Sequence, residues 1–446
     1  MKILLIAFYF APLNKIAAIR PSKLCKYWVR SGHDVTVLTA DNERAFPLHD
    51  RLLLSTELEQ CSIVRTPFLS RTLLKKSVRS ADGEPARQGG SPAAEVKPQA
   101  VSLLRRTLEW TRTFFNEENS SWYWMSRGAL RRLMRNEKFD MVVSTFGPIN
   151  CHRLGMYAKK LQPSVQWIAD FRDPYYMTDD FKLGPVRKAL IKRRETNVYQ
   201  KADCITFISE GITEFARSLS LNKPVEIITN GFDLDDNRQA GAVTERKGKL
   251  TVAYAGSIYA HMRDATALFE AIRDLIEAGS IAADDITVEY AGYHGAILKS
   301  FAEKCNLQAI VTDHGMLPRE KALALLSGAD ATLLLTTNRR NRQGVTTGKF
   351  YDYLLVGRPI IALVGGDIPN SEVAQMIREN GLGFVWEEAG GPQETERLKE
   401  YLLARLAGRQ AGEGNLAGEF RESFAYGTLA ERFIELGRKG KNPLLS

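Results

Sequence analysis

The sequence predicts an α/β protein built from two doubly wound parallel sheets, each covered by helices on both faces. Short apolar runs alternate with amphipathic stretches along most of the chain, which is typical of parallel strands joined by helices. The alternation stops at the polar segment 235–249 and then restarts. A chain of 446 residues is also long enough to bury a separate core in each of two domains.

The first domain is expected to span residues 1–235. Residues 80–100 within it are rich in Pro, Gly and Ala, a composition that predicts a disordered insertion. Amphipathic stretches separate most of the strand-like runs, so we expect helices between them. The predicted strands are KILLIAFYF at the N-terminus and the runs at 33–40, 61–67, 139–145, 165–171, 203–209 and 224–230.

The second domain is expected over residues 250–425, and a C-terminal tail that can be helical over 426–446. Its predicted strands are the runs at 250–256, 286–292, 331–337 and 358–365. In both sheets the carboxyl ends of the strands are the places to look for a ligand.

The composition is that of an ordinary soluble enzyme, with 44% hydrophobic and 25% charged residues. No apolar run approaches the ~18 residues of a membrane-spanning helix. The N-terminal run MKILLIAFYF has no small-residue cleavage site after it, so it predicts a first strand and not a signal peptide. The five cysteines lie far apart and form no metal-type pair, which fits a reducing cytoplasm.

The net charge of +9 is concentrated in one segment, because residues 71–135 hold 13 Lys and Arg against 6 Asp and Glu. Within it, 103–115 predicts a helix with basic and apolar faces, and the aromatic residues of 120–125 follow. Such a segment suits an anionic lipid surface, and it equally suits a helix packed on its own domain. Nucleic acid is disfavoured, since no recognisable binding motif accompanies the basic residues.

Two loops of the first domain are candidate ligand-binding sites. The loop APLNKIAAIR after the first strand lacks the G-x-G-x-x-G of a dinucleotide site, which disfavours NAD. The loop after WIAD brings together Asp170, Arg172 and Asp173. These residues either form an internal salt bridge that closes a turn or present an acid and a base to a cleft.

In the second domain the stretch GVTTGKFYDYLLVGRPI, residues 344–360, has the pattern of an anion site. A turn over 344–348 would present backbone amides and the start of a helix, to which Lys349 adds a cation. Asp352 follows one helical turn later and can accept paired hydroxyls. The set fits a nucleotide diphosphate joined to a ribose. A capped helix with a solvated acid is the alternative.

Taken together, these motifs make the whole chain resemble a family-4 glycosyltransferase of the GT-B fold, in the branch with a D-F-R-D-P motif. The resemblance implies two Rossmann-like domains that face each other across a cleft. It also implies sugar transfer with retention from a nucleotide-diphosphate donor, UDP- or GDP-linked, without a metal or other cofactor. The supporting segments are RSGHDVTVLT, FDMVVSTFGPINCHRLG, WIADFRDPYY, KADCITFISEGI, ITNGFD, YAGSIY, HGMLPREKALALLSGAD and TGKFYDYLLVGRPIIAL.

The same resemblance assigns the donor site to the second domain. Asp352 would take the ribose hydroxyls, and Arg263 and Lys349 would stabilise charge on the leaving diphosphate, which makes these two cations catalytic. The remaining donor-binding residues would be Gly256, Ser257, Gly315, Met316, Leu317, Gly344, Thr346, Thr347 and Gly348, with the base held near 315–317.

By the same resemblance, the acceptor would bind to the first domain. Arg172, Asp173 and His152 are the candidates for orienting the acceptor hydroxyl, and Asn14 and Arg20 the further acceptor-binding candidates. His152 as a helix-cap histidine is the alternative. A retaining transferase can pass the acceptor proton to the leaving phosphate, so no strong base is required.

Two features depart from the pattern of the family. The first is the N-terminal loop, which is often Gly-Gly in the family and is Leu13-Asn14-Lys15-Ile16-Ala17-Ala18 here. The second is the acidic pair, which is Glu, seven residues, Glu in the family, whereas this chain has Gly344 and Asp352 at those positions. DLDD at 233–236 resembles the Asp-x-Asp metal motif of another glycosyltransferase fold, but we expect no metal there.

The expected role is polysaccharide or glycolipid synthesis by a cytoplasmic protein bound peripherally to the inner face of the cell membrane. Its partners would be a nucleotide sugar, a lipid-linked or glycan acceptor and an anionic membrane surface. A sugar-nucleotide epimerase of the same architecture and a non-catalytic scaffold of this fold are the alternatives.

Overall fold

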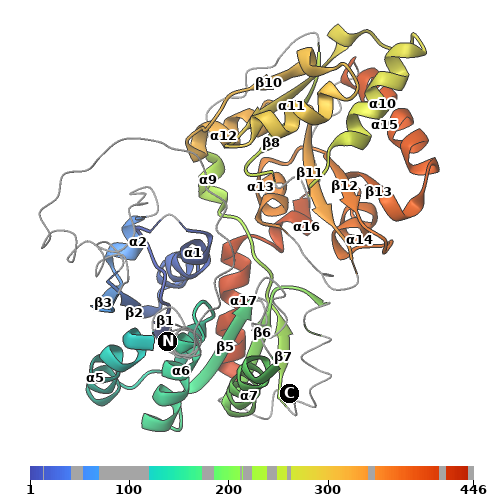
Figure 1. Ribbon diagram of the computed structural model, residues 1–446. Coiled ribbons are helices and arrows are strands. Elements are labelled where there is room, and N and C mark those ends of the chain that lie inside the picture. Colours follow the sequence, from blue (N-terminus) through green and yellow to red (C-terminus); the bar gives the residue numbers. More distant parts are fainter. Residues whose placement is uncertain are drawn as a thin grey trace, which may run out of the picture. The chain divides into compact units, whose positions relative to one another are not determined.

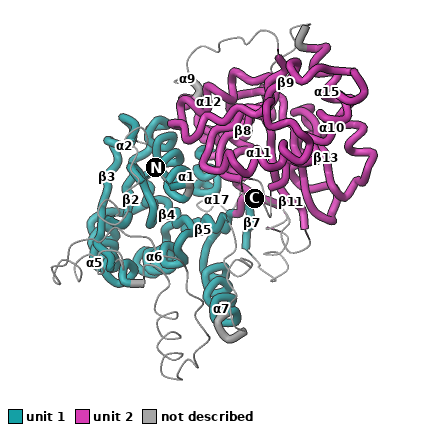
Figure 2. Tube along the Cα trace, turned by 45° about the horizontal axis from the view of Figure 1, so that its top comes forward, with its two compact units in different colours: residues 1–206, 221–226, 430–446 teal, residues 207–220, 227–429 magenta. Residues whose placement is uncertain are grey.

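The computed structural model divides the chain into two compact units, coloured separately in Figure 2. Unit 1 holds residues 1–206, 221–226 and 430–446, and unit 2 holds residues 207–220 and 227–429. The structure describes residues 1–13, 15–41, 54–69, 120–172, 185–210, 213, 223–238, 249–258, 263–339, 347–410 and 418–439. The predicted insertion at 80–100 and the predicted basic helix at 103–115 lie outside the described residues.

Unit 1 contains a seven-stranded sheet in the order β3-β2-β1-β4-β5-β6-β7 (Figure 1). The pairs from β3 through β5 are parallel, and the order reverses beside β1, as in a doubly wound sheet. The central strand β1 is apolar at every buried position, and β4 is apolar over its first three residues before the buried Ser144 and Thr145, because helices cover both faces of these strands. The strands are β1 Lys2–Ile6, β2 Asp34–Ala40, β3 Ser62–Thr66, β4 Met141–Thr145, β5 Gln166–Arg172, β6 Cys204–Phe207 and β7 Val225–Ile227.

The helices of unit 1 include one from the far end of the chain. Trp28 of α1 donates its indole N–H to the carbonyl oxygen of Ala430 at 3.0 Å, and its ring meets Phe433 edge-on. The C-terminal helix α17 therefore packs into the core of unit 1, and the units differ in this respect from the predicted domains. The helices are α1 Ile16–Arg30, α2 Thr56–Glu59, α5 Ser120–Asn136, α6 Asn150–Leu161, α7 Pro185–Lys201 and α17 Tyr426–Lys439.

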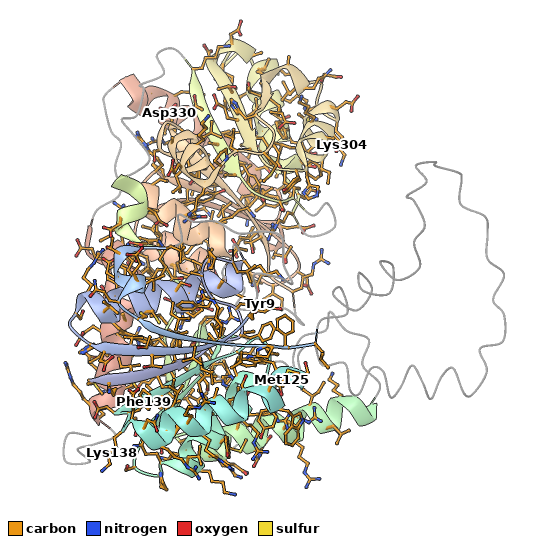
Figure 3. All side chains as sticks on the ribbon, turned by 90° about the vertical axis from the view of Figure 1, so that its left-hand side faces the viewer. Tyr9, Met125, Lys138, Phe139, Lys304 and Asp330 are labelled. Carbon is orange, nitrogen blue, oxygen red and sulfur yellow. The ribbon has the colours of Figure 1, made fainter. Side chains whose placement is uncertain are left out.

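Unit 2 contains a six-stranded parallel sheet in the order β10-β9-β8-β11-β12-β13. Side chains of β8 alternate between its faces: Val252 and Tyr254 join one core cluster, and Ala253 joins the other. Asp330, labelled in Figure 3, accepts the backbone N–H of Thr251 at 2.7 Å and so fixes the start of this strand. The strands are β8 Leu250–Ala255, β9 Ile286–Ala291, β10 Val311–Asp313, β11 Ala331–Thr337, β12 Ile360–Gly365 and β13 Gly383–Glu387.

Helices cover both faces of this second sheet. Helices α10, α11 and α15 pack on the face of Val252, and α12, α13 and α14 on the face of Ala253. The prediction of two doubly wound α/β domains is thus confirmed. The helices are α9 Leu234–Arg238, α10 Thr266–Glu277, α11 Gly295–Glu303, α12 Arg319–Ser327, α13 Gly348–Val356, α14 Glu372–Glu379, α15 Gln393–Gln410 and α16 Gly418–Glu422.

Among the described helices, none combines the length and the apolar character that crossing a bilayer requires.

Candidate functional site

The loop after β8 brings the two predicted cations of unit 2 together. Gly256 has a φ of +118°, and a Cβ atom built on it would lie 2.6 Å from Cε of Lys349. Only glycine combines this backbone conformation with room for the lysine side chain. The loop is therefore shaped to let Lys349 lie directly against it.

The carbonyl oxygen of Ser257 is where these cations meet. It accepts hydrogen bonds from the Tyr254 hydroxyl at 2.8 Å, from Arg263 NH1 at 2.6 Å and from Lys349 Nζ at 3.4 Å. Tyr290, stacked on Tyr254, donates its hydroxyl to the neighbouring carbonyl of Gly256 at 2.9 Å. The two buried tyrosines fix the loop, and two cations converge on it.

Lys349 is easier to deprotonate than an ordinary lysine. Burial first, and then the nearby Arg263 guanidinium, lower its pKa to about 8, and Asp352 opposes this shift. Its ammonium also lies 5.2 Å from the centre of the Tyr254 ring. Because burial and Arg263 both disfavour the ammonium form, an anion bound here would stabilise it.

The start of α13 adds donors for an anion. Thr347 is its N-cap residue in an extended conformation, and its side chain makes no capping hydrogen bond. The Oγ1 atom of Thr347 is buried with no partner among the described residues. The first amides of a helix lack partners within it and attract negative charge, so hydroxyl, amides and Lys349 form one set. The predicted residues Gly344 and Thr346 lie outside the described part of the chain.

Asp352 is engaged by a residue that the sequence did not single out. Its Oδ1 atom accepts a hydrogen bond from NH2 of Arg319 at 2.9 Å, and the same nitrogen lies 3.3 Å from Oδ2 of Asp236. Asp236 belongs to the DLDD motif, so this motif carries an ion pair. No group of three or more metal-ligating side chains occurs among the described residues.

The predicted base-binding loop lies at the ends of β9 and β10. Gly315, with a φ of +63°, accepts the backbone N–H of Gly292 at 2.8 Å, so the two loops are joined. Met316 is 53% exposed, and Tyr293, which the sequence analysis did not select, is 73% exposed. Exposed side chains beside a hydrogen-bonded loop pair leave a surface on which a base can lie.

In unit 1 the question about Asp170 has a clear answer. Its carboxylate is fully buried and accepts bonds from Arg20 Nε at 3.1 Å and Arg20 NH2 at 3.0 Å. Thr145 and Thr206 each add a hydroxyl at 2.9 Å. Burial alone would raise the pKa of Asp170, but Arg20 and the other donors outweigh it and hold the pKa low. Asp170 therefore forms a salt bridge with Arg20 of α1, 150 residues away, and not the bridge within the loop that the sequence suggested.

Two of the predicted acceptor-binding residues, Arg20 and Arg172, are bound within unit 1. Arg20 is 1% exposed and its guanidinium is bound to Asp170, so its side chain is not presented to an acceptor. Arg172 ends β5 with a φ of +56°, and its guanidinium donates to the carbonyl oxygen of Phe146. Asp173 and Asn14 lie outside the described residues.

His152 lies inside the first turn of α6 and is completely buried. Its Nδ1 atom is 2.8 Å from Ser144 Oγ, which in turn accepts the indole N–H of Trp167 at 2.9 Å. The serine oxygen has a second lone pair and a proton of its own, so it can accept from Nδ1 or donate to it, and these contacts do not fix the tautomer of His152. Nε2 is buried without a partner among the described residues. Burial keeps the imidazole of His152 neutral.

We expect His152 to make unit 1 sensitive to acid. Burial lowers its pKa from 6.5 to about 3, so the unfolded chain binds the proton more readily than the folded one. The free energy of unfolding should therefore fall as pH drops from about 6.5 towards 3. His152→Asn keeps an acceptor for Ser144 but does not titrate, and should flatten this slope in urea unfolding. An equal slope in both proteins would contradict the assignment.

Comparison with known protein families finds a match in the N-terminal half of the chain. Residues 17–231, just under half of the chain, match the sequence pattern of the glycosyl transferase 4-like domain. This region is similar to the glycosyl transferase 4-like domain. No curated protein sequence matches the chain significantly.

Solved structures match nearly the whole chain at low identity. Sucrose-phosphate synthase from Thermosynechococcus elongatus is 13% identical over 98% of both chains, with a TM-score of 0.55. The E. coli trehalose-6-phosphate structure bound with UDP-2-fluoro glucose is 12% identical over 98% of this chain and 99% of that chain, with a TM-score of 0.56. The lipopolysaccharide outer core galactosyltransferase WaaB is 12% identical over the same shares, with a TM-score of 0.51. These matches show the fold, which is the predicted GT-B fold.

The region that matches the glycosyl transferase 4-like pattern contains none of the predicted donor-binding residues. The groups around Ser257 and Asp352 lie C-terminal to residue 231, beyond the matched region. We therefore infer a donor site from the geometry of unit 2.

Proposed function

We propose that the chain is a glycosyltransferase that moves a sugar from a nucleotide-diphosphate donor to an acceptor hydroxyl with retention. The observation that carries the proposal is the convergence of Lys349 and Arg263 on one carbonyl oxygen in unit 2, with α13 starting at Gly348. A diphosphate would supply the negative charge that these groups favour. Asp352 on the same helix would bind the ribose.

The chemistry needs little more than charge stabilisation. As the glycosidic bond breaks, negative charge grows on the departing diphosphate, where Lys349 and Arg263 lower the energy of the transition state. The acceptor hydroxyl can give its proton to that leaving phosphate. A neutral His152 fits this scheme, since it can orient an oxygen without acting as a base.

The donor is identified by a panel of nucleotide sugars, UDP-, GDP-, ADP- and dTDP-linked, tested for thermal stabilisation of the whole chain. Support comes from the E. coli structure of the same fold, which is bound with UDP-2-fluoro glucose. One nucleotide class should raise the melting temperature of the wild-type protein, and much less that of Asp352→Asn. Failure of every nucleotide sugar to stabilise the wild type would count against the proposal.

We further propose that the enzyme acts at an anionic membrane surface that carries a lipid-linked or glycan acceptor. Helix α5 contains four arginines and no acidic residue. Trp124 is 62% exposed and Met125, labelled in Figure 3, is 42% exposed. Arg127 lies 5.2 Å from the Trp124 ring, so cationic and aromatic groups alternate on this surface. That combination suits the interface of an anionic bilayer.

Vesicle co-sedimentation tests this surface. Arg132→Gln with Arg135→Gln removes two exposed cations, each worth about 1 kcal/mol at an anionic leaflet, so binding should weaken about thirtyfold. Lys299→Gln with Lys304→Gln removes the same charge from unit 2 and should have little effect. Equal sedimentation with anionic and neutral vesicles would rule the surface out.

A further inference from the structure

We propose that Arg319 and Asp236 are positioning residues of the donor site, which hold Asp352 so that its second carboxylate oxygen faces the ribose hydroxyls. This inference rests on the proposed function, because it concerns how the nucleotide is recognised. Neither residue touches the sugar or the diphosphate in this scheme. Their effect passes through Asp352.

The geometry places one guanidinium between two carboxylates from different helices. NH2 of Arg319, the first residue of α12, lies 2.9 Å from Oδ1 of Asp352 on α13 and 3.3 Å from Oδ2 of Asp236 on α9. No described residue donates a hydrogen bond to Oδ2 of Asp352, so that atom keeps its acceptor capacity. Arg319 thus occupies one oxygen of Asp352 and leaves the other available.

All three side chains are accessible to a ligand from solvent. The side chains of Asp352, Asp236 and Arg319 are 29%, 20% and 39% exposed. The two carboxylates, Asp352 first, raise the pKa of Arg319 above its ordinary value, so the guanidinium stays charged at any physiological pH. The cluster is therefore a permanent ion triad at the surface of unit 2.

Charge explains why the arginine is needed. Asp352 and Asp236 share one guanidinium, and a diphosphate would add further negative charge nearby. Without Arg319 the Asp352 carboxylate would face an anionic ligand without this counter-charge, and its side chain would lose the contact that fixes its rotamer. A rotamer fixed before binding removes an entropy cost from the binding step.

The short side chain of Asp352 is a second reason why its rotamer must be fixed. Aspartate has one methylene fewer than glutamate, so its carboxylate reaches less far, and small rotations move its oxygens out of line with the two hydroxyls of a ribose. The bond from NH2 of Arg319 to Oδ1 restricts such rotation, and the planar guanidinium head is more pre-organised than a lysine ammonium. Pro318, with a φ of −54°, precedes Arg319 and fixes the backbone from which the arginine projects.

The test is ribose discrimination, measured by isothermal titration calorimetry on the full chain. The probes are UDP, GDP and ADP, each against its 2′-deoxy counterpart. The wild-type protein should bind the ribose form of its nucleotide roughly tenfold or more tightly than the deoxy form, as expected for a hydrogen bond to a carboxylate. Arg319→Gln should reduce that ratio to about one, and Arg319→Lys should restore part of it.

The matched control is Arg273→Gln. Arg273 is 38% exposed and likewise lies between two carboxylates, 2.7 Å from Asp274 and 3.8 Å from Glu277. Its loss should leave the ratio unchanged. Asp236→Asn should lower the ratio less than Arg319→Gln does, and in the Asp352→Asn background Arg319→Gln should have no further effect on it. A general loss of stability would weaken both probes equally and leave the ratio intact.

Two results separate this inference from the proposed function. If the wild-type protein discriminates ribose and Arg319→Gln discriminates equally well, the positioning role is wrong and the donor site stands. If Arg319→Gln binds more tightly than the wild type, Arg319 competes for Asp352, and the inference is likewise overturned. If the wild type binds none of the nucleotides, the proposed function fails and this inference fails with it.

Discussion

Lys349→Ala should lower the turnover number about a hundredfold to a thousandfold, with a much smaller change in donor affinity. The reason is that charge on the leaving diphosphate grows towards the transition state, and removal of one stabilising group from such a site has an effect of this size. Arg263→Ala should behave in the same way, because both side chains reach the carbonyl oxygen of Ser257. Steady-state kinetics with the donor found by the panel measures both.

Lys399→Ala is the control for this prediction, since Lys399 belongs to the same unit and pairs with Glu396 away from the loop after β8. It should leave turnover unchanged. If Lys349→Ala raises only the Michaelis constant while turnover holds, the cations bind the ground state and the catalytic role is wrong.

The pKa of about 8 for Lys349 gives the same site a pH signature. A diphosphate stabilises the ammonium form, so nucleotide binding above that pH must take up a proton, and affinity should fall as pH rises beyond about 8. Lys349→Arg should bind with little change between pH 7 and 9, because arginine does not titrate there.

Arg20→Met should destabilise unit 1 by about 3–5 kcal/mol, the usual effect of removing one partner of a buried ion pair. The substitution would leave Asp170 fully buried without its counter-charge. Urea unfolding followed by tryptophan fluorescence reports mainly on this unit, because Trp386 is the only one of the six tryptophans in unit 2.

Two companion variants test the electrostatic cause. Arg438→Met breaks an exposed pair with Glu431 in the same unit and should change stability by only about 0–1 kcal/mol. Arg20→Met combined with Asp170→Asn removes both buried charges and should recover part of the lost stability. A single Arg20→Met variant as stable as the wild type would contradict the account of Asp170.

Periodicity was sufficient to predict most of the sheet strands. The runs at 250–256 and 358–365 became β8 and β12 because they are buried on both faces and so read as continuous apolar stretches. Strands β10 and β13 were missed. β10 has three residues, two of them exposed, and β13, with the sequence GFVWE, has neither a long apolar run nor clear alternation.

The sequence could predict only those parts of the site whose residues lie within one short segment. Lys349 and Asp352 share a helix, so their proximity follows from spacing alone. Arg20 and Asp170 are 150 residues apart in the chain, and a buried pair of that kind is visible only once β5 and α1 are folded. Arg319 was missed for the same reason, since its partners come from α9 and α13, although its place just after Pro318 at a helix start was a visible signal.

The most direct test of the central claim is release of nucleoside diphosphate from nucleotide sugars by the purified chain. The assay compares wild type, Lys349→Ala and Asp352→Asn with each sugar of the panel, with and without candidate acceptors. We predict that the wild type releases the diphosphate from one nucleotide class, faster with an acceptor, and that Lys349→Ala does so about a hundredfold more slowly. Equal release by all three proteins, or none from any donor with any acceptor, would contradict the assignment of unit 2 as the donor site of a glycosyltransferase.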